Sequence, residues 1–166
     1  PYTVLVVGAS WPTKCWPEGH FAVLGDWLYN YGVIPVLVGS GPVESQKAAE
    51  IAAKMDIPPI DLVGKLNFKQ LAYLFQQSAA VVGGDTGPTH LAVGIGAKTV
   101  MLMGPTYPRR TGPYGQMENL LVAARDCREC MKRACPLGHD CLAVIKPEQV
   151  EEKLKALVPA LAAVSI

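Results

Sequence analysis

Short apolar stretches alternate with longer amphipathic ones along this chain. Six apolar stretches, nearly continuous in Val, Leu and Ile, predict β-strands buried on both faces, at residues 3–7, 34–38, 60–63, 80–82, 99–103 and 120–123. Amphipathic stretches predict helices at residues 19–31, 43–55, 68–77, 89–94 and 147–158. This alternation predicts an α/β fold, a Rossmann-like parallel sheet with helices on both faces.

Residues at the ends of the predicted helices support their boundaries. Gly32 follows the first helix, Pro58 and Pro59 follow the second, and Asn67 stands where an N-cap should precede the third. From residue 104 to residue 141 the pattern changes to Pro, Gly, Arg and Cys around a single short strand. Such a segment is typical of a long functional loop rather than of a linker between two cores.

Length and composition indicate one folded domain over residues 1–166. Of these residues 50% are apolar and only 17% are charged, which excludes intrinsic disorder. Fifteen basic and fourteen acidic side chains give a net charge of +1, so we expect no nucleic-acid partner bound through bulk charge. No apolar run approaches the roughly 20 residues that span a bilayer.

The start of the chain has no basic region ahead of an apolar stretch, so we do not expect a signal peptide. It also lacks an initiator Met and opens directly on a strand pattern. We therefore expect the sequence to come from the interior of a longer protein.

In an open parallel sheet, ligands bind beyond the carboxyl ends of the strands, and four loops there carry suitable residues. The first loop, residues 8–17, places Ser10 and Lys14 ahead of a helix, although it matches neither Walker A nor GxGxxG. A lysine and backbone N–H groups in this position suit a phosphate. A solvated lysine beside two packing tryptophans is the alternative, and this loop alone leaves both interpretations open.

The second loop, residues 39–44, is a turn of small residues with an acid in the first turn of the next helix. Gly39 allows a ligand to approach the backbone closely, and Glu44 can accept hydrogen bonds from ribose hydroxyls. Glu44 equally suits the positive end of the helix dipole without any ligand. Both roles stay open at this point.

The third loop, residues 81–90, is the most informative, because a buried strand runs into glycines, an acid and hydroxyls before a proline opens a helix. Thr86, Gly87 and His90 surround the free N–H groups of that helix start, which suits a diphosphate. Asp85 is an anion, so beside a phosphate it needs another role: it caps the helix, or it bonds loop N–H groups or a sugar hydroxyl. By itself, His90 is compatible with a structural role. Because it stands beside the hydroxyls and free N–H groups of this loop, we favour contact with a ligand.

The fourth loop, residues 104–110, again offers glycine, a hydroxyl and positive charge. Each of the four loops is weak evidence by itself. Because the carboxyl ends of parallel strands meet at one edge of a sheet, the four loops together predict a site for a polyanionic nucleotide.

Cys127, Cys130, Cys135 and Cys141 stand within fifteen residues, and Cys15 is elsewhere. Without a secretory signal, four thiols so close together favour a metal site over disulfides. Their spacing is not that of two C-x2-C knuckles, which a structural zinc site normally uses. A structural metal and reduced or partly oxidised thiols both stay open, and a metal here would hold the loop rather than carry out the chemistry.

Several motifs resemble, in order along the chain, the carboxyl-terminal half of the glycosyltransferase family 9 heptosyltransferases. The most specific is D-T-G-P-T-H-L-A at residues 85–92, followed by K-C-W-P at residues 14–17. G-S-G-P-V-E at residues 39–44, G-P-T at residues 104–106 and the four-cysteine segment agree, so the resemblance covers nearly all of the chain. It implies one half of the two-domain arrangement called GT-B.

Members of that family transfer heptose from ADP-heptose to the inner core of lipopolysaccharide with inversion. The resemblance implies that this half binds the nucleotide sugar as a substrate and that transfer requires no cofactor. It places the diphosphate at Ser10 and Lys14, with Lys14 stabilising the leaving group, the ribose at Glu44 and the base against Leu66. The sugar and phosphates would be surrounded by Asp85, Thr86, Gly87 and His90. Where some relatives carry a hydroxyl before Ser10, this chain has Ala9.

The same resemblance puts the acceptor-activating base in the amino-terminal half, so we expect no general base here and no transfer by this chain alone. It implies a lipid-linked saccharide acceptor bound through that half, and work in the cytoplasm at the inner face of the cytoplasmic membrane, with peripheral membrane contact. The residues also leave alternatives: a stand-alone nucleotide-binding or interaction module, another nucleotide-sugar enzyme such as an epimerase, or a metal-stabilised structural domain.

Overall fold

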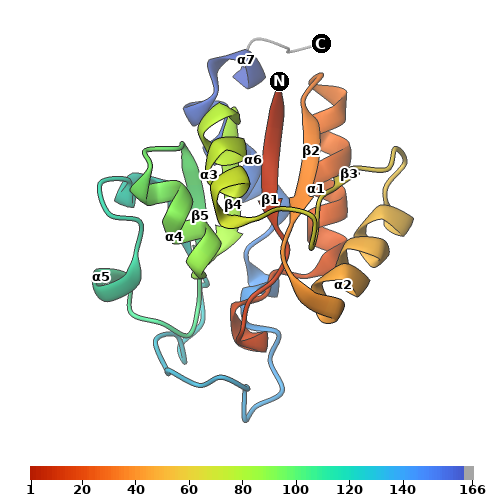
Figure 1. Cartoon of the computed structure of the whole chain (residues 1–166). Coiled ribbons are helices and arrows are strands. Elements are labelled where there is room, and N and C mark those ends of the chain that lie inside the picture. Colours follow the sequence, from red (N-terminus) through yellow and green to blue (C-terminus); the bar gives the residue numbers. More distant parts are fainter. Residues whose placement is uncertain (163–166) are drawn as a thin grey trace.

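The structure, a computed structural model that describes residues 1–162, is a six-stranded parallel sheet between two layers of helices (Figure 1). The strands are β1 (Tyr2–Val6), β2 (Ile34–Val38), β3 (Ile60–Asp61), β4 (Ala80–Gly84), β5 (Thr99–Met103) and β6 (Leu120–Val122). Their order is β3-β2-β1-β4-β5-β6, and every pair is parallel. This is the Rossmann order, whose topological switch point lies between β1 and β4.

Within residues 1–162, seven helices and three short 3-10 turns lie between the strands or follow the last one. The helices are α1 (Glu18–Asn30), α2 (Gly41–Lys54), α3 (Phe68–Gln77), α4 (Gly87–Gly94), α5 (Pro108–Thr111), α6 (Pro147–Leu157) and α7 (Pro159–Ala162). The 3-10 turns are η1 (Pro12–Lys14), η2 (Met117–Asn119) and η3 (Cys141–Val144).

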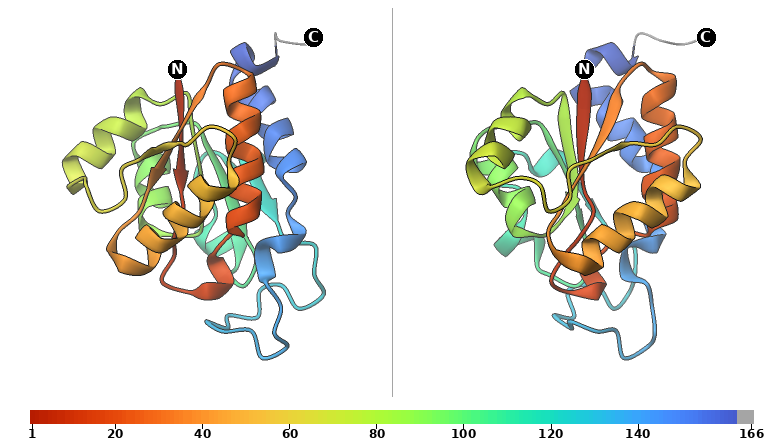
Figure 2. Two further views of the ribbon diagram at one scale, coloured as in Figure 1. Left: turned by 90° about the vertical axis from the view of Figure 1, so that its right-hand side faces the viewer. Right: turned by 45° about the vertical axis from the view of Figure 1, so that its right-hand side comes forward.

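The two helix layers bury the two faces of the sheet (Figure 2). Side chains alternate along β1, so Leu5 joins the cluster under α1, α2 and α6, while Val4 and Val6 join the cluster under α3 and α4. Trp16 is 2% exposed and belongs to the first cluster, where its indole N–H donates to the Ile145 carbonyl at 2.8 Å. The four inner strands, β1, β2, β4 and β5, are therefore largely buried on both faces, as their apolar sequences predict. The edge strands β3 and β6 are only partly buried, so the predicted burial is wrong for them.

Local chemistry explains where the helices begin. At α3, the Asn67 side chain accepts from the Gln70 amide at 3.0 Å and the Gln70 side chain accepts from the Asn67 amide at 2.9 Å. This capping box confirms the predicted N-cap. At α2, Gly41 has φ +82° and already starts the helix, two residues before the predicted start. The left-handed backbone there favours glycine.

All six predicted strands and all five predicted helices are present, with some different ends. β3 has two residues rather than four, because the Asp61 side chain accepts from the Val63 amide at 2.9 Å in a local turn. α4 begins at Gly87, two residues earlier than predicted. The pattern did not predict α5, α7 or the 3-10 turns, since elements of three or four residues are too short to show a hydrophobic period.

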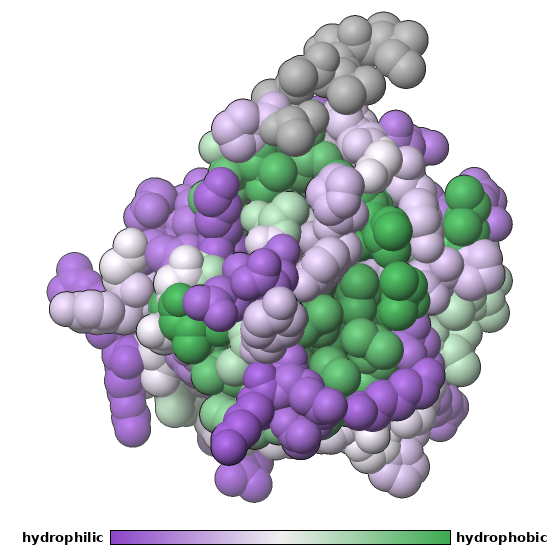
Figure 3. Space-filling view, turned by 45° about the horizontal axis from the view of Figure 1, so that its top comes forward, coloured by the Kyte–Doolittle hydropathy of each residue, from purple (hydrophilic) through white to green (hydrophobic). Residues whose placement is uncertain are grey.

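The surface carries apolar as well as polar side chains. Figure 3 shows an apolar area bordered by polar side chains on the face seen obliquely from the N-terminal end of the strands. Large exposed apolar side chains include Ile57, Phe68 and Tyr73, which are 54%, 68% and 66% exposed. Over residues 1–162, none of the helices has the length and apolar character that crossing a membrane requires.

Gly84 at the end of β4 allows the β1–α1 loop to reach the sheet. A Cβ at this position would collide with the backbone carbonyl oxygen of Lys14. Because that neighbour is backbone, it has little freedom to move aside. The place of Lys14 in the fold therefore depends on glycine at position 84.

We expect Gly84→Ala to lower the free energy of unfolding by about 1–3 kcal/mol, because the Lys14 backbone must shift. Gly94→Ala is the matched control: the added Cβ meets no atom within 4 Å and lies in α4. Replacing a helical glycine by alanine should leave stability unchanged or raise it by about 0.5–1 kcal/mol. Chemical denaturation of both variants measures this, and equal stability of the two variants would contradict the close-approach argument.

Candidate functional site

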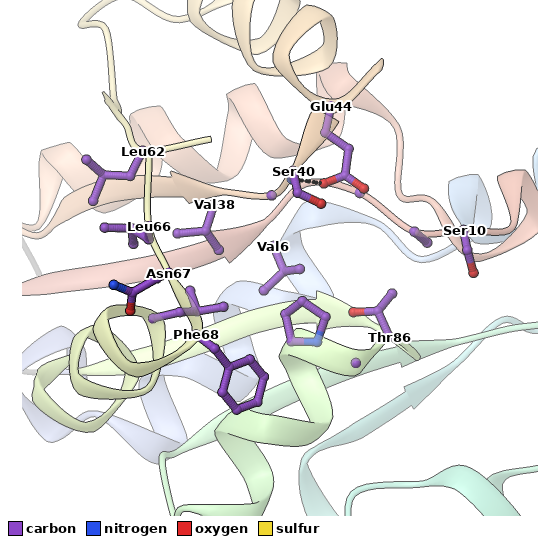
Figure 4. Close-up of a pocket in the computed structure, with 16 residues that line it drawn as sticks. Val6, Ser10, Val38, Ser40, Glu44, Leu62, Leu66, Asn67, Phe68 and Thr86 are labelled. Carbon is purple, nitrogen blue, oxygen red and sulfur yellow. Dashed lines mark hydrogen bonds between the residues drawn. The ribbon is translucent and has the colours of Figure 1, made fainter. Parts of the chain in front are cut away.

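A cavity of about 400 Å³ lies beyond the carboxyl ends of β1, β2 and β4, and so includes the switch point between β1 and β4, where a ligand is expected. Figure 4 shows that one end of it is apolar, with Val6, Val38, Leu62 and Leu66 pointing in. Ser10, Ser40, Glu44 and Thr86 gather toward the other end, which is therefore polar. The cavity thus suits an elongated ligand with one apolar and one polar part.

Glu44 forms part of the polar wall. Its carboxylate accepts a hydrogen bond from the Ser40 amide and lies over Gly8 and Gly39, where any Cβ would overlap it. The two glycines thus leave room for this side chain, and the first turn of α2 fixes its direction. With one oxygen held by the backbone, Glu44 can still accept hydrogen bonds from a ligand hydroxyl.

A charged cluster adjoins the cavity at the carboxyl ends of β1, β4 and β5. The Asp85 carboxylate, 5% exposed, lies 2.7 Å from His90 Nε2 and 3.1 Å from Lys14 Nζ. It also accepts from the hydroxyls of Thr106 at 2.7 Å and Thr111 at 3.1 Å. One buried carboxylate thus binds donors from three segments of the chain, those that follow β1, β4 and β5.

The pKa of Asp85 follows from these contacts. Burial alone would raise the pKa, but hydrogen bonds from His90, Thr106 and Lys14 outweigh burial and hold the pKa of Asp85 well below its usual range. Asp85 is therefore ionised at neutral pH. It keeps the Lys14 ammonium in one position while the other ammonium protons remain available to a ligand.

The structure corrects one role considered for Asp85. Thr86, not Asp85, is the N-cap of α4, and its side chain makes no capping hydrogen bond. The Thr86 hydroxyl instead lies 3.1 Å from the Thr89 hydroxyl. The first N–H groups of α4 are consequently not capped by a side chain, and both Thr86 and Gly87 line the cavity.

Lys14 is not a solvated lysine, because its side chain is only 15% exposed. Its ammonium lies 4.5 Å from the centre of the Trp11 ring in addition to its contact with Asp85. The two tryptophans of this loop differ in role, since Trp16 belongs to the core and Trp11 lies beside Lys14. The solvated-lysine alternative is therefore wrong.

The predicted site residues fall into two adjoining groups. Those that line the cavity are Ser10, Gly39, Glu44, Leu66, Thr86 and Gly87. Lys14, Asp85 and His90 form the charged cluster. Thr106 and Thr111 were not predicted as site residues, although the fourth loop, which carries Thr106, was singled out for a hydroxyl.

The four neighbouring cysteines lie in or next to the cysteine loop, which we define as residues 123–140 between β6 and η3. All of them are free thiols, and Cys127 Sγ lies 3.9 Å from His139 Nδ1. Within residues 1–162, no group of three or more His, Cys, Asp or Glu side chains is arranged to hold a metal ion. The structural metal suggested by the spacing of Cys127, Cys130, Cys135 and Cys141 thus gains no support from the structure.

Comparisons with known proteins identify the family to which this chain is similar. The model of glycosyltransferase family 9 (heptosyltransferase) matches residues 1–140. Lipopolysaccharide heptosyltransferase 1 of Pseudomonas aeruginosa is 29% identical, over 95% of this chain and 48% of the relative. The chain therefore spans about half the length of the curated relatives it matches.

Solved structures show the same fold. ADP-heptose lipopolysaccharide heptosyltransferase II of E. coli superposes with a TM-score of 0.80 at 28% identity, over 98% of this chain and 48% of that one. The E. coli heptosyltransferase WaaC with ADP gives a TM-score of 0.72 at 25% identity, over 94% of this chain and 44% of that one.

We expect Asp85→Asn to lower the free energy of unfolding at pH 7 by about 2 kcal/mol, because charged hydrogen bonds to Lys14 and His90 are lost. The pKa of Asp85 is lower in the folded than in the unfolded chain, so its stabilisation is present above pH 4 and is lost as the pH falls further. Denaturation of both proteins at pH 7 and at about pH 3 should show the difference shrinking in acid. Asp126→Asn, at an exposed aspartate of the cysteine loop, is the control. A difference that does not change with pH would contradict this account.

Proposed function

Because the chain belongs to glycosyltransferase family 9, the heptosyltransferases, we propose that it is the donor-binding half of an inverting heptosyltransferase of lipopolysaccharide core biosynthesis. The donor is ADP-heptose or a similar nucleotide sugar. The observation that supports this most strongly is the cavity, whose apolar end, polar wall and adjoining charged cluster follow one another in space. Base, ribose and diphosphate follow one another in the same order in a nucleotide sugar.

The proposed pose assigns one part of the donor to each part of the site. The base lies against Leu66 at the apolar end, and the ribose hydroxyls bond Glu44. The diphosphate extends past Ser10 to the start of α4 and to Lys14, where free N–H groups and an ammonium meet. The heptose then lies near Asp85, Thr86, Gly87 and His90. A similar protein, the E. coli heptosyltransferase WaaC, was solved with ADP, which supports a nucleotide as the ligand.

The proposed reaction is a displacement at the anomeric carbon of the donor. The acceptor hydroxyl oxygen forms the new bond to that carbon, the bond from the carbon to the diphosphate breaks, and the hydroxyl proton passes to a base. Negative charge develops on the departing diphosphate, and Lys14 with the N-terminus of α4 is placed to stabilise it. These groups supply the positive charge, so we propose that transfer requires no cofactor.

The base and the acceptor site belong, in this proposal, to a second domain. Asp85 and His90 bond each other and serve the donor, so neither is free to take the acceptor proton. The relatives are about twice as long as this chain, which leaves room for such a domain. We propose that residues 1–166 are one nucleotide-sugar-binding domain that transfers no sugar alone. The full protein would use a lipid-linked saccharide at the inner face of the cytoplasmic membrane.

Binding of ADP, ADP-heptose and adenosine, measured by calorimetry, tests this function. We expect the chain to bind ADP and ADP-heptose, and Lys14→Ala to weaken ADP binding by about tenfold or more, because a charged hydrogen bond to the diphosphate is lost. Adenosine has no phosphate, so its affinity should hardly change. Glu44→Gln should weaken ADP and adenosine alike, because both carry the ribose.

Lys98→Ala is the matched control, since Lys98 is exposed and lies before β5, at the end of the sheet opposite the cavity. The thermal unfolding of each variant shows whether it remains folded. Failure of the parent chain to bind ADP at millimolar concentration would reject the proposed function. Equal losses of ADP and adenosine in Lys14→Ala would reject the role of Lys14.

A further inference from the structure

Two cations approach the same aromatic ring beside the proposed diphosphate position. Lys14 Nζ lies 4.5 Å from the centre of the Trp11 ring, and Arg133 Cζ lies 5.4 Å from the same centre. The two cationic groups are therefore at most about 10 Å apart. Ser10, which precedes Trp11, lines the nucleotide cavity, so this pair of cations lies close to its polar end.

The fold holds Arg133 at this place although it is far from Lys14 in the sequence. Thr13, 3% exposed, donates its hydroxyl hydrogen bond to the carbonyl oxygens of Lys132 and Arg133, at 2.8 and 3.1 Å. Figure 1 shows the corresponding contact at the carboxyl ends of the strands, where the blue cysteine loop runs beside the red turn before α1. Thr13 thus fixes the backbone of the cysteine loop at the residue that carries the cation.

Two further contacts fix the same loop to the end of β5. The Glu129 amide donates to the Gly104 carbonyl at 2.9 Å, and the Met131 amide donates to the Pro105 carbonyl at 2.7 Å. Glu129 and Met131 both have positive φ, 63° and 57°, which non-glycine residues rarely adopt. The loop is therefore held in a defined conformation between the loops after β1 and β5.

Lys14 alone does not balance the negative charge of a diphosphate. Asp85 lies 3.1 Å from Lys14 and offsets much of its charge, whereas a diphosphate carries more than one negative charge. The ion pairs between residues 1 and 162 are Lys14–Asp85, Lys47–Glu18 and His90–Asp85, and none involves Arg133. Arg133 is exposed, and among residues 1–162 its guanidinium approaches the Trp11 ring without a side-chain hydrogen bond or ion pair, so it can turn to an anion.

We propose that Arg133 is a second cationic residue of the diphosphate site and that the cysteine loop is part of the donor site. This proposal rests on the proposed function. The gap in question lies between the Lys14 ammonium and the Arg133 guanidinium. A diphosphate has oxygens at both ends, and each end can accept a charged hydrogen bond of about 2.8 Å, so one diphosphate can bridge the two cations. Arg133 then stabilises the same developing charge as Lys14.

The test measures binding of ADP, inorganic pyrophosphate and adenosine to the 166-residue chain, with a thiol reductant to keep the cysteines free. We expect Arg133→Ala to weaken ADP and pyrophosphate by about tenfold, as loss of a charged hydrogen bond predicts, and to leave adenosine unchanged. Arg133→Lys should keep most of the affinity, because a cation remains. Arg128→Ala is the control, since Arg128 is exposed in the same loop and makes no ion pair in the described residues.

Each other outcome decides against a particular claim. If Arg133→Ala binds ADP and pyrophosphate as the parent does, the role of Arg133 is wrong and the donor function stands. If ADP, pyrophosphate and adenosine all weaken equally, Arg133 is merely structural and the proposal fails. A third outcome is that pyrophosphate binding depends on Arg133 but ADP binds no better than pyrophosphate. The anion site is then supported, but the nucleoside adds no affinity, so the nucleotide-sugar function is wrong. If the parent binds neither ADP nor pyrophosphate, both proposals are wrong.

Discussion

The buried carboxylate of Asp85 is the constraint on which the site depends. A carboxylate that is 5% exposed has lost its water, and an unpaired buried charge costs several kcal/mol. Asp85 avoids this with four donors, from Lys14 after β1, His90 in α4, and Thr106 and Thr111 after β5. If any of these segments moved away, the Asp85 carboxylate would lose a hydrogen-bond donor. One side chain thus holds the ends of three strands together.

The cavity inherits its shape from that arrangement. Thr86 and Gly87 directly follow Asp85, so the carboxylate that fixes β4 also fixes the start of α4 at the cavity wall. The apolar end has a different origin, because Val6 and Val38 are core residues at the ends of β1 and β2. The apolar part of the site is therefore an uncovered edge of the core, and the polar part is built from loops. This division explains why one cavity suits two chemically different parts of a ligand.

The sequence predicted elements and motifs that are local, and it could not predict contacts between distant residues. The four inner strands are continuous apolar runs and the edge strands β3 and β6 lie in shorter ones, so all six were recognisable. Glu44 and His90 stand in short motifs beside helix starts, so the sequence alone marks them as candidate site residues. Thr106 and Thr111 are 21 and 26 residues from Asp85, and only the folded sheet brings them to it. The spacing of the cysteines suggested a metal site. The positions of the thiols depend on the path of the loop, and within residues 1–162 the thiols do not come together as a group of metal ligands.

A carboxylate beside the proposed phosphate site looks unfavourable, yet on that proposal it would favour a highly charged ligand. Asp85 holds Lys14 in one conformation, so ordering this long side chain adds little entropic cost when a ligand binds. It also reduces the attraction that Lys14 exerts on a singly charged anion. A diphosphate carries enough charge to bind in spite of Asp85, through the remaining ammonium protons and the free N–H groups of α4. The nearly neutral chain thus places the Lys14 ammonium at the proposed phosphate position, and the acid next to it would favour the more highly charged ligand.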